Sequence, residues 1–329
     1  MNTIREDTLI RQQKAALRRV RSFNRELEAF APWIEKGWFD NERLDACRQA
    51  LLTGGKPYDV LIDALCEDGV CHLRGARLSY LSRETLGLML REIFLNGSYR
   101  FSCATDAPVI LDCGANIGVA VCWYKLRWPK ARVIAFEPWP KAYAVLQRNI
   151  EQNGWQDVTV LPYALAGTQG EAAFHIPAGN DLAGTLTDRV FDRGPVETEE
   201  TTVERRTLGQ FLPAHVDFMK MDIEGTEAAV LREIAPRLAD IDRIFCEYHY
   251  SAALPDNSLA AIASLLEGAG FVYTVGISEA FLGRRLSPFT GLGTRISLEI
   301  HAAQPAVCGT AAAAADDTER SAEQEEDNA

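Results

Sequence analysis

The sequence lacks the features of membrane-spanning, secreted and zinc-binding proteins. Its 329 residues are 47% hydrophobic, but no run approaches about 18 consecutive apolar residues, so no membrane span is predicted. The first twenty residues, Met1 to Val20, have no apolar core of the kind found in a secretory signal. The eight cysteines form no CxxC pair and no cysteine–histidine cluster, which favours reduced thiols and a cytoplasmic location.

Basic charge is also scarce, and the formal net charge is −12. Between Ala311 and Ala329, seven acidic residues and one basic residue carry −6, so half of the excess lies there. Residues 306–329 are therefore predicted to form a disordered acidic tail. The rest of the chain is mildly acidic, which argues against a nucleic-acid partner.

Residues 1–79 are predicted to form an N-terminal helical segment. Between Leu9 and Phe30, apolar residues recur at steps of three and four, which places them on one stripe of a helix. Packing of this stripe on the protein's own body is the simplest interpretation. A short coiled coil that joins copies into a homo-oligomer, or a helix on a membrane surface, remains open as an alternative.

Two further elements are predicted before the main domain. The stretch "VCHLRGARLSYL" is typical of a hairpin that turns at Gly75. The stretch "SRETLGLMLREIFLNG" predicts a helix that is capped by Ser82 and ends at Asn96 and Gly97.

From Pro108 onward, short apolar runs alternate with helical patterns of about 10–15 residues. This alternation predicts an α/β domain with a mostly parallel sheet and helices on both faces. Such sheets bind ligands at the carboxyl ends of their strands. The predicted strands are "PVILDCG", "ARVIAFEP", "DVTVLPYAL", "EAAFHIP", "TTVERRTL", "VDFMKMD", "IDRIFCEYH", "FVYTVG" and "TRISLEIHAA".

The stretch "VILDCGANIG", residues 109–118, leaves a strand and enters a helix that Asn116 is predicted to cap. Helix N-termini commonly hold phosphates. However, Asn116 stands where the dinucleotide motif G-x-G-x-x-G has its second glycine, and Asp112 would repel a pyrophosphate. A nicotinamide-dependent dehydrogenase is therefore disfavoured.

S-adenosylmethionine fits this turn better than a phosphate ligand. Asp112 suits its ammonium and sulfonium charges, and backbone N–H groups suit its carboxylate. Glycines leave room for its flat body, and Glu137, at the end of the next strand, suits the two ribose hydroxyls.

These motifs, together with "VLPYALAG", "FMKMDIEGTEAAVLREI" and "CEYH", resemble the FkbM family of S-adenosylmethionine-dependent methyltransferases over roughly residues 80–305. The densest part has the pattern K-x-D-x-E-G-x-E and reads Lys220, Asp222, Glu224, Gly225 and Glu227. The resemblance implies a Rossmann-like class I methyltransferase fold with a seven-stranded sheet. It also implies O-methylation of a hydroxyl on a sugar or other natural-product small molecule.

We expect the cofactor to lie against residues that follow the strand ends. Two of them, Tyr163 and Ala164, are placed beside the adenine by the family position alone. The expected cofactor residues are Asp112, Gly114, Ala115, Asn116, Gly118, Glu137, Tyr163, Ala164 and Asp222.

The acceptor is expected to meet Asp222, Glu247 and His249, because all three lie at the ends of neighbouring strands. His249 is the candidate general base, and Asp222 binds the ammonium or orients the acceptor hydroxyl. Lys220 is expected to pair with Asp222. The three acceptor residues are also compatible with a divalent metal, but none is expected.

Other interpretations stay open. The same cofactor residues would serve an N-methyltransferase acting on a small molecule or peptide. A cofactor-binding protein without catalysis, assembled through its N-terminal helices, is a second alternative. The long polar stretch at residues 178–200 is either a lid over the acceptor pocket or a plain excursion.

Overall fold

The structure is a computed structural model that describes residues 62, 65–179, 181–186, 197–250, 254–277 and 296–308. Its contacts divide the chain into two compact units, Met1–Ser98 and Tyr99–Ala329. Most of the predicted N-terminal helical segment, and the acidic tail beyond Cys308, lie outside the described residues. Within the described residues, no helix is long and apolar enough to cross a membrane.

The first unit contains the predicted hairpin and helix. Its sheet is antiparallel, in the order β1-β2-β3, and Gly75 has a φ of 75° at the turn between the last two strands. The Ser82 hydroxyl accepts a hydrogen bond from the Thr85 N–H at 3.4 Å, and the left-handed Gly97 ends the helical stretch. Both predictions are confirmed, although the second half of the helix has π-helical hydrogen bonding. The elements are β1 (Cys66–Glu67), β2 (Val70–Leu73), β3 (Ala76–Ser79), α4 (Arg83–Leu90) and η2 (Arg91–Asn96).

The second unit is built on a seven-stranded sheet in the order β12-β13-β11-β10-β4-β5-β6. Only β13 runs antiparallel to its neighbours, so the predicted mostly parallel sheet is confirmed. The central strands consist of buried residues, as expected where both faces of a sheet are covered. The strands are β4 (Val109–Cys113), β5 (Arg132–Phe136), β6 (Val158–Leu161), β10 (Phe218–Met221), β11 (Arg243–Tyr250), β12 (Val272–Ile277) and β13 (Ile296–Ala303).

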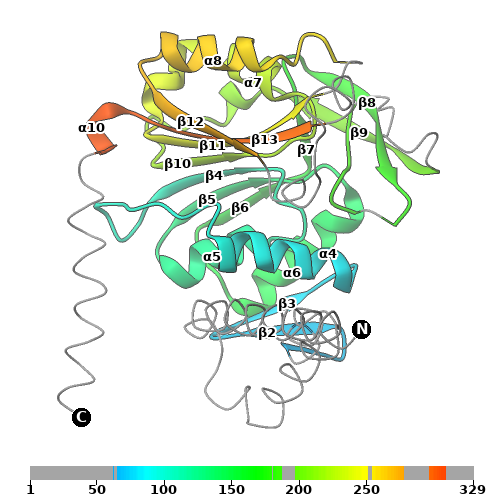
Figure 1. Ribbon diagram of the computed structural model, residues 1–329. Helices are drawn as coiled ribbons and strands as arrows, with labels where there is room; N and C mark the ends of the chain where they lie inside the picture. Colours follow the sequence, from blue (N-terminus) through cyan, green and yellow to red (C-terminus); the bar gives the residue numbers. More distant parts are fainter. Residues whose placement is uncertain are drawn as a thin grey trace, which may run out of the picture. The chain divides into compact units, whose positions relative to one another are not determined.

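Helices cover both faces of this sheet. Figure 1 shows α5 and α6 on one face and α7 and α8 on the other. The core between the sheet and the helices includes Leu111, Met219 and Leu231, which have no exposed surface. The helices of this unit are α5 (Val119–Arg127), α6 (Pro140–Asn153), η3 (Leu208–Gln210), α7 (Glu227–Glu233), η4 (Ala235–Asp240), α8 (Leu259–Gly268) and α10 (Pro305–Cys308).

A separate three-stranded sheet has the order β7-β9-β8, with β7 (Tyr163–Leu165), β8 (Gly170–Pro177) and β9 (Thr198–Arg206). The prediction of one strand over "DVTVLPYAL" is therefore wrong, because this stretch forms β6 in the large sheet and β7 in the small one. Pro162 separates the two strands. A proline has no N–H to donate to a neighbouring strand, so the ladder is interrupted there.

Candidate active site

The strand order brings the predicted site residues to one edge of the large sheet. In the parallel register, Asp112 of β4 lies beside Lys220 of β10, and Met221 of β10 lies beside Cys246 of β11. Asp112, Asp222, Glu247 and His249 therefore lie at or near the carboxyl ends of neighbouring strands, where open α/β sheets bind their ligands. The carboxyl ends of β4, β5, β10 and β11 carry the residues described below.

The turn between β4 and α5 has an unusual backbone. Gly114, Asn116 and Gly118 all have positive φ values, of 89°, 48° and 86°. A Cβ on Gly114 would stand 2.0 Å from the carbonyl oxygen of Asp222, so this position requires glycine. The prediction that Asn116 caps α5 is wrong, because Gly118 is the N-cap and no side chain caps the helix. Asn116 instead accepts from the Ile117 N–H at 2.7 Å.

The amide N–H groups of residues 114–118 all donate within the protein. Two of them share the carbonyl oxygen of Phe136, at 3.1 and 2.9 Å. Asn116 donates to Glu137 Oε2 at 2.8 Å, and the last two donate to oxygens within the turn at 2.7 and 2.9 Å. The expectation that these amides hold the cofactor's carboxylate is therefore wrong. The same observation speaks against a pyrophosphate, which needs free N–H groups at this turn.

Glu137 lies directly after β5, where the sequence placed it. Its side chain is buried and accepts hydrogen bonds from the Asn116 N–H and the Trp139 N–H, both at 2.8 Å. Burial raises the pKa of this carboxyl to about 7, although the two backbone hydrogen bonds oppose the shift. Each carboxylate oxygen has capacity for a further donor. Two adjacent ribose hydroxyls are donors of the required kind.

Lys220 connects the two aspartates at the centre of the edge. Its Nζ lies 3.6 Å from Asp112 Oδ1 and 3.5 Å from Asp222 Oδ2, and it donates to the Gly114 carbonyl at 2.5 Å. The predicted Lys220–Asp222 pair is confirmed. Asp112 is fully buried, and neither of its oxygens has a hydrogen-bond partner. Burial raises the pKa of Asp112, and Lys220 opposes that shift. Asp112 therefore has no surface for a ligand and contacts the site only through its ion pair with Lys220. The side chain of Asp222 is 26% exposed and can contact a ligand directly.

Four carboxylates surround the buried imidazole of His249. Its Nδ1 lies 3.0 Å from Glu227 Oε1. Its Nε2 lies 3.5 Å from Glu224 Oε2, 3.6 Å from Glu247 Oε1 and 3.9 Å from Asp222 Oδ1. Burial lowers the pKa of His249, but the carboxylates outweigh it and raise the pKa to about 9. The predicted neighbours of His249 are thus brought together. This shift favours the protonated imidazole, which cannot accept a proton, so the arrangement does not support the expected role of His249 as general base.

Two residues hold His249 in place: Glu227, which belongs to the K-x-D-x-E-G-x-E pattern, and Asn257, which sequence analysis missed. Glu227 is the first residue of α7 and is fully buried. It accepts from the Gly225 N–H at 2.9 Å and from Asn257 Nδ2 at 2.6 Å. Asn257 also donates to the carbonyl of His249 at 3.1 Å. Asn257 precedes α8, and no local pattern in the sequence relates it to Glu227.

Part of the predicted lid contacts both turns of the site. In the described residues 181–186, the carbonyl of Asp181 accepts from Asn116 Nδ2 at 2.8 Å. The hydroxyl of Thr185, which is fully buried, donates to the carbonyl of Glu224 at 2.8 Å. This segment therefore joins the β4–α5 turn to the β10–α7 turn. Thr185 was another residue that the sequence gave no reason to select.

The two residues expected beside the adenine lie in β7. The Tyr163 ring stacks on Phe211 with centroids 5.7 Å apart, and the Arg206 guanidinium lies 5.3 Å from its centre. Ala164 is buried. Their role beside an adenine stays a prediction.

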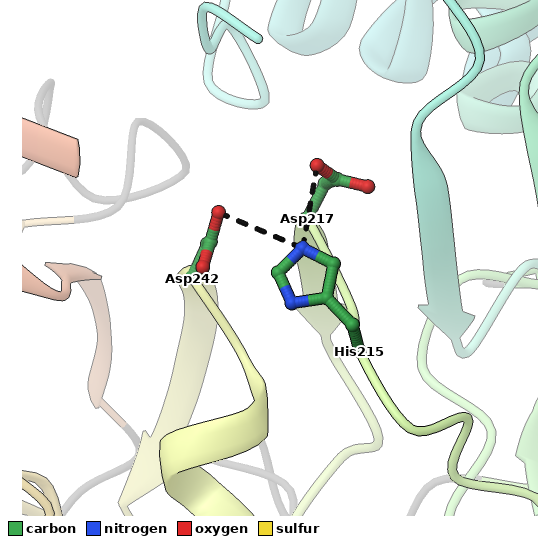
Figure 2. A group of neighbouring side chains, drawn as sticks. All are labelled: His215, Asp217 and Asp242. Carbon is green, nitrogen blue, oxygen red and sulfur yellow. Dashed lines mark ion pairs between the residues drawn. The ribbon is translucent and has the colours of Figure 1, made fainter. Parts of the chain in front are cut away.

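A second group of acids and a histidine lies at the opposite, amino-terminal ends of β10 and β11. His215 Nε2 is 3.6 Å from Asp217 Oδ1 and 3.8 Å from Asp242 Oδ2 (Figure 2). Asp217 also accepts from the Val109 N–H at 2.8 Å and from the Cys103 thiol at 3.2 Å. These bonds give Asp217 a structural role in joining the start of β4 to the start of β10.

Known methyltransferases are similar in sequence to the part of the chain that carries this site. Residues 112–273 match the methyltransferase FkbM domain. Methyltransferase sdnD of Sordaria araneosa is 25% identical over 229 residues, covering 60% of this chain and 87% of the relative. The 31-O-demethyl-FK506 methyltransferase FkbM of Streptomyces tacrolimicus is 25% identical over 249 residues, with coverages of 64% and 92%. The 2-O-methyltransferase NoeI of Sinorhizobium fredii is 28% identical over 179 residues, with coverages of 48% and 71%.

A solved structure of methyltransferase FkbM from Methylobacillus flagellatus KT is 18% identical and covers 85% of this chain and 59% of that one, with a TM-score of 0.38. The matched residues include Asp112, Glu137, Asp222 and His249. Residues 112–273 therefore carry the methyltransferase FkbM domain of the S-adenosylmethionine-dependent methyltransferases that this chain resembles.

Proposed function

We propose that the chain transfers a methyl group from S-adenosylmethionine to a hydroxyl oxygen of a sugar or other natural-product small molecule. This proposal rests on two sets of acidic side chains that lie at the same edge of the sheet. One is the Glu137 carboxylate beside the glycine turn, and the other is the acidic cluster around His249. The names of two relatives, a 31-O-demethyl-FK506 methyltransferase and a 2-O-methyltransferase, support oxygen as the methylated atom.

The residues present fit the cofactor. The carboxylates at this edge outnumber Lys220, so their combined charge suits a cationic ligand, and the buried oxygens of Asp112 have no hydrogen-bond partner. Glycine is required at position 114, where the backbone passes close to Asp222. When bound, S-adenosylmethionine supplies a methyl group on a positively charged sulfur. Glu137 would accept hydrogen bonds from its ribose hydroxyls.

The cluster of Asp222, Glu247 and His249 would handle the acceptor. The hydroxyl must lose its proton as its oxygen forms the new bond to carbon, and a carboxylate of the cluster, Asp222 or Glu247, would take that proton. A positioned group contributes about 10²–10⁴ in rate to such a proton transfer. Alignment of the two reactants lowers the barrier by about 7–11 kcal/mol in favourable systems. Asp222 is the most exposed of the three acceptor side chains, which suits it to orient the hydroxyl.

The test is a product assay with an isotopically labelled methyl donor and matched panels of hydroxyl and amine compounds. Mass spectrometry should show one added methyl group on a hydroxyl compound. The variant His249→Ala should bind S-adenosylhomocysteine as the wild type does and lose about 10²–10⁴ in turnover. His215→Ala removes a histidine beside two acids at the opposite end of the same strands and should leave turnover unchanged. Methylation of amines alone would refute O-methylation and favour the N-methyltransferase alternative.

A further inference from the structure

We propose that Asp222, Glu224 and His249 bind one divalent cation, of the class of Mn²⁺, at the acceptor end of the active site. The sequence left a divalent metal open at Asp222, Glu247 and His249 but gave no reason to expect one, and it did not include Glu224 among the ligands. In the structure, α7 begins only at Glu227, and Glu224 lies in the preceding turn with a φ of 56°. Its carboxylate is therefore directed at the same histidine nitrogen as Asp222.

The distances around His249 Nε2 fit shared coordination better than hydrogen bonding. Hydrogen bonds of this kind join atoms about 2.7–3.2 Å apart, and Nδ1 makes one to Glu227 at 3.0 Å. The carboxylate oxygens of Glu224 and Asp222 instead lie 3.5 and 3.9 Å from Nε2. Ligand atoms about 2.1 Å from one ion lie about 3.0 Å apart when adjacent and about 4.2 Å when opposite. The three ligand atoms all lie within 4.8 Å of one another.

The surroundings of His249 have the form of a supported metal ligand. Metal-binding histidines commonly donate the second ring N–H to a carboxylate, which fixes the tautomer and the ring orientation. Glu227 occupies that position and is itself held by the Gly225 N–H and by Asn257. This chain of bonds leaves Nε2 directed at Asp222 and Glu224.

Charge and ligand type agree with this assignment. The cluster places four carboxylates around one imidazole, and this concentration of negative charge attracts a cation. Carboxylate oxygens suit Mn²⁺ and Mg²⁺, and one imidazole nitrogen moves the preference toward transition metals. Glu247 Oε1, 3.6 Å from Nε2, is close enough to join the set.

The role of the ion rests on the proposed function. An ion held by Asp222 at the exposed side of the cluster would bind the acceptor's hydroxyl oxygen and lower the pKa of that hydroxyl. The released proton would pass to the Glu247 carboxylate or to water. His249 would then act as a ligand of the ion instead of taking the proton itself. The acceptor class is accordingly an alcohol, which offers the ion an oxygen ligand.

Binding of Mn²⁺ alone to the metal-free full-length chain tests the site without any activity measurement. The free-ion signal in electron paramagnetic resonance falls as Mn²⁺ binds. The titration uses the His215→Ala background, so that the second acid–histidine group cannot contribute. We expect one saturable site in this background. Adding Glu224→Gln, which keeps the side chain's size, should weaken binding at least about tenfold, and Asp222→Asn should act likewise.

Two results would overturn the ion site: no saturable binding of Mn²⁺ in the His215→Ala background, or equal binding after Glu224→Gln and Asp222→Asn. Calorimetry with S-adenosylhomocysteine on the same samples separates this inference from the proposed function. A chain that binds the thioether but no Mn²⁺ refutes the ion and leaves methyl transfer standing. A chain that binds Mn²⁺ through Glu224 but no thioether supports the ion site and refutes the proposed function.

Discussion

Proton release by Glu137 offers a direct test of the cofactor site. Burial raises the pKa of this carboxyl from 4.5 to about 7 in the unliganded protein. This difference corresponds to about 3 kcal/mol in favour of the protonated form. Ribose hydroxyls would donate hydrogen bonds to the carboxylate and so favour the ionised form. Cofactor binding should therefore lower the pKa of Glu137 and release a proton wherever Glu137 is protonated in the free protein.

The expected magnitude follows from the pKa of about 7. At about pH 6, Glu137 is about 90% protonated in the free protein, so binding should release close to one proton per ligand. Affinity for S-adenosylhomocysteine should accordingly fall about tenfold, or about 1.4 kcal/mol, between about pH 8 and about pH 6. Affinity falls as the pH falls because the protonated Glu137 carboxyl is a weaker hydrogen-bond acceptor for the ribose hydroxyls than the carboxylate is.

Calorimetry in two buffers with different ionisation enthalpies counts the released protons. The control is Glu137→Gln, which keeps a side-chain carbonyl but has no ionisable proton, and it should remove this pH dependence. The pKa of Asp112 is also raised, and Asp112 is still present in this variant. Any pH dependence of affinity that remains in Glu137→Gln would therefore come from Asp112. Equal affinity at both pH values in the wild-type protein, without proton release, would show that Glu137 does not receive the ribose.

Three further predictions concern the scaffold of the site. Gly154→Ala should destabilise the protein by about 1–2 kcal/mol, because Gly154 has a positive φ but open space around it. Gly114→Ala should destabilise it by more, because Gly114 has a positive φ and also faces a backbone oxygen. Equal thermal unfolding temperatures of the two variants would contradict this. Asn257→Ala should cost about 1–3 kcal/mol in denaturant unfolding, since it leaves a buried carboxylate oxygen and a helix amide without partners; an unchanged midpoint would refute it. In the native protein, the exposed Cys308 should react with a thiol reagent. The fully buried Cys113, whose pKa burial raises, should react only after unfolding, and early labelling would contradict its placement.

Local patterns were sufficient to predict much of the fold. The alternation of apolar runs and helical patterns predicted the large parallel sheet because its central strands are almost entirely buried. The hairpin at Gly75 and the cap at Ser82 were predictable because their causes lie within a few residues of each position. The strand ends then placed Glu137, Asp222 and His249 at one edge without any knowledge of side-chain contacts.

The remaining features depend on contacts between distant segments. Asn116 was assigned as a helix cap from its neighbours in the sequence. In the structure, its side-chain amide donates to the carbonyl of Asp181 in another segment, and Gly118 is the N-cap of α5. Asn257 and Glu227 meet only because α7 and α8 pack on the same face of the sheet (Figure 1). The role of Glu224 became visible only once its turn was placed beside the end of β11.

The central claim is that this sheet edge binds a cationic methyl donor and does not bind nucleotide diphosphates. Calorimetric titration of the wild-type chain with S-adenosylhomocysteine and with NAD, side by side, tests it most directly. The acidic edge and the fully engaged amides of residues 114–118 predict binding of the thioether and no binding of NAD. Binding of NAD with no detectable binding of the thioether would contradict the account.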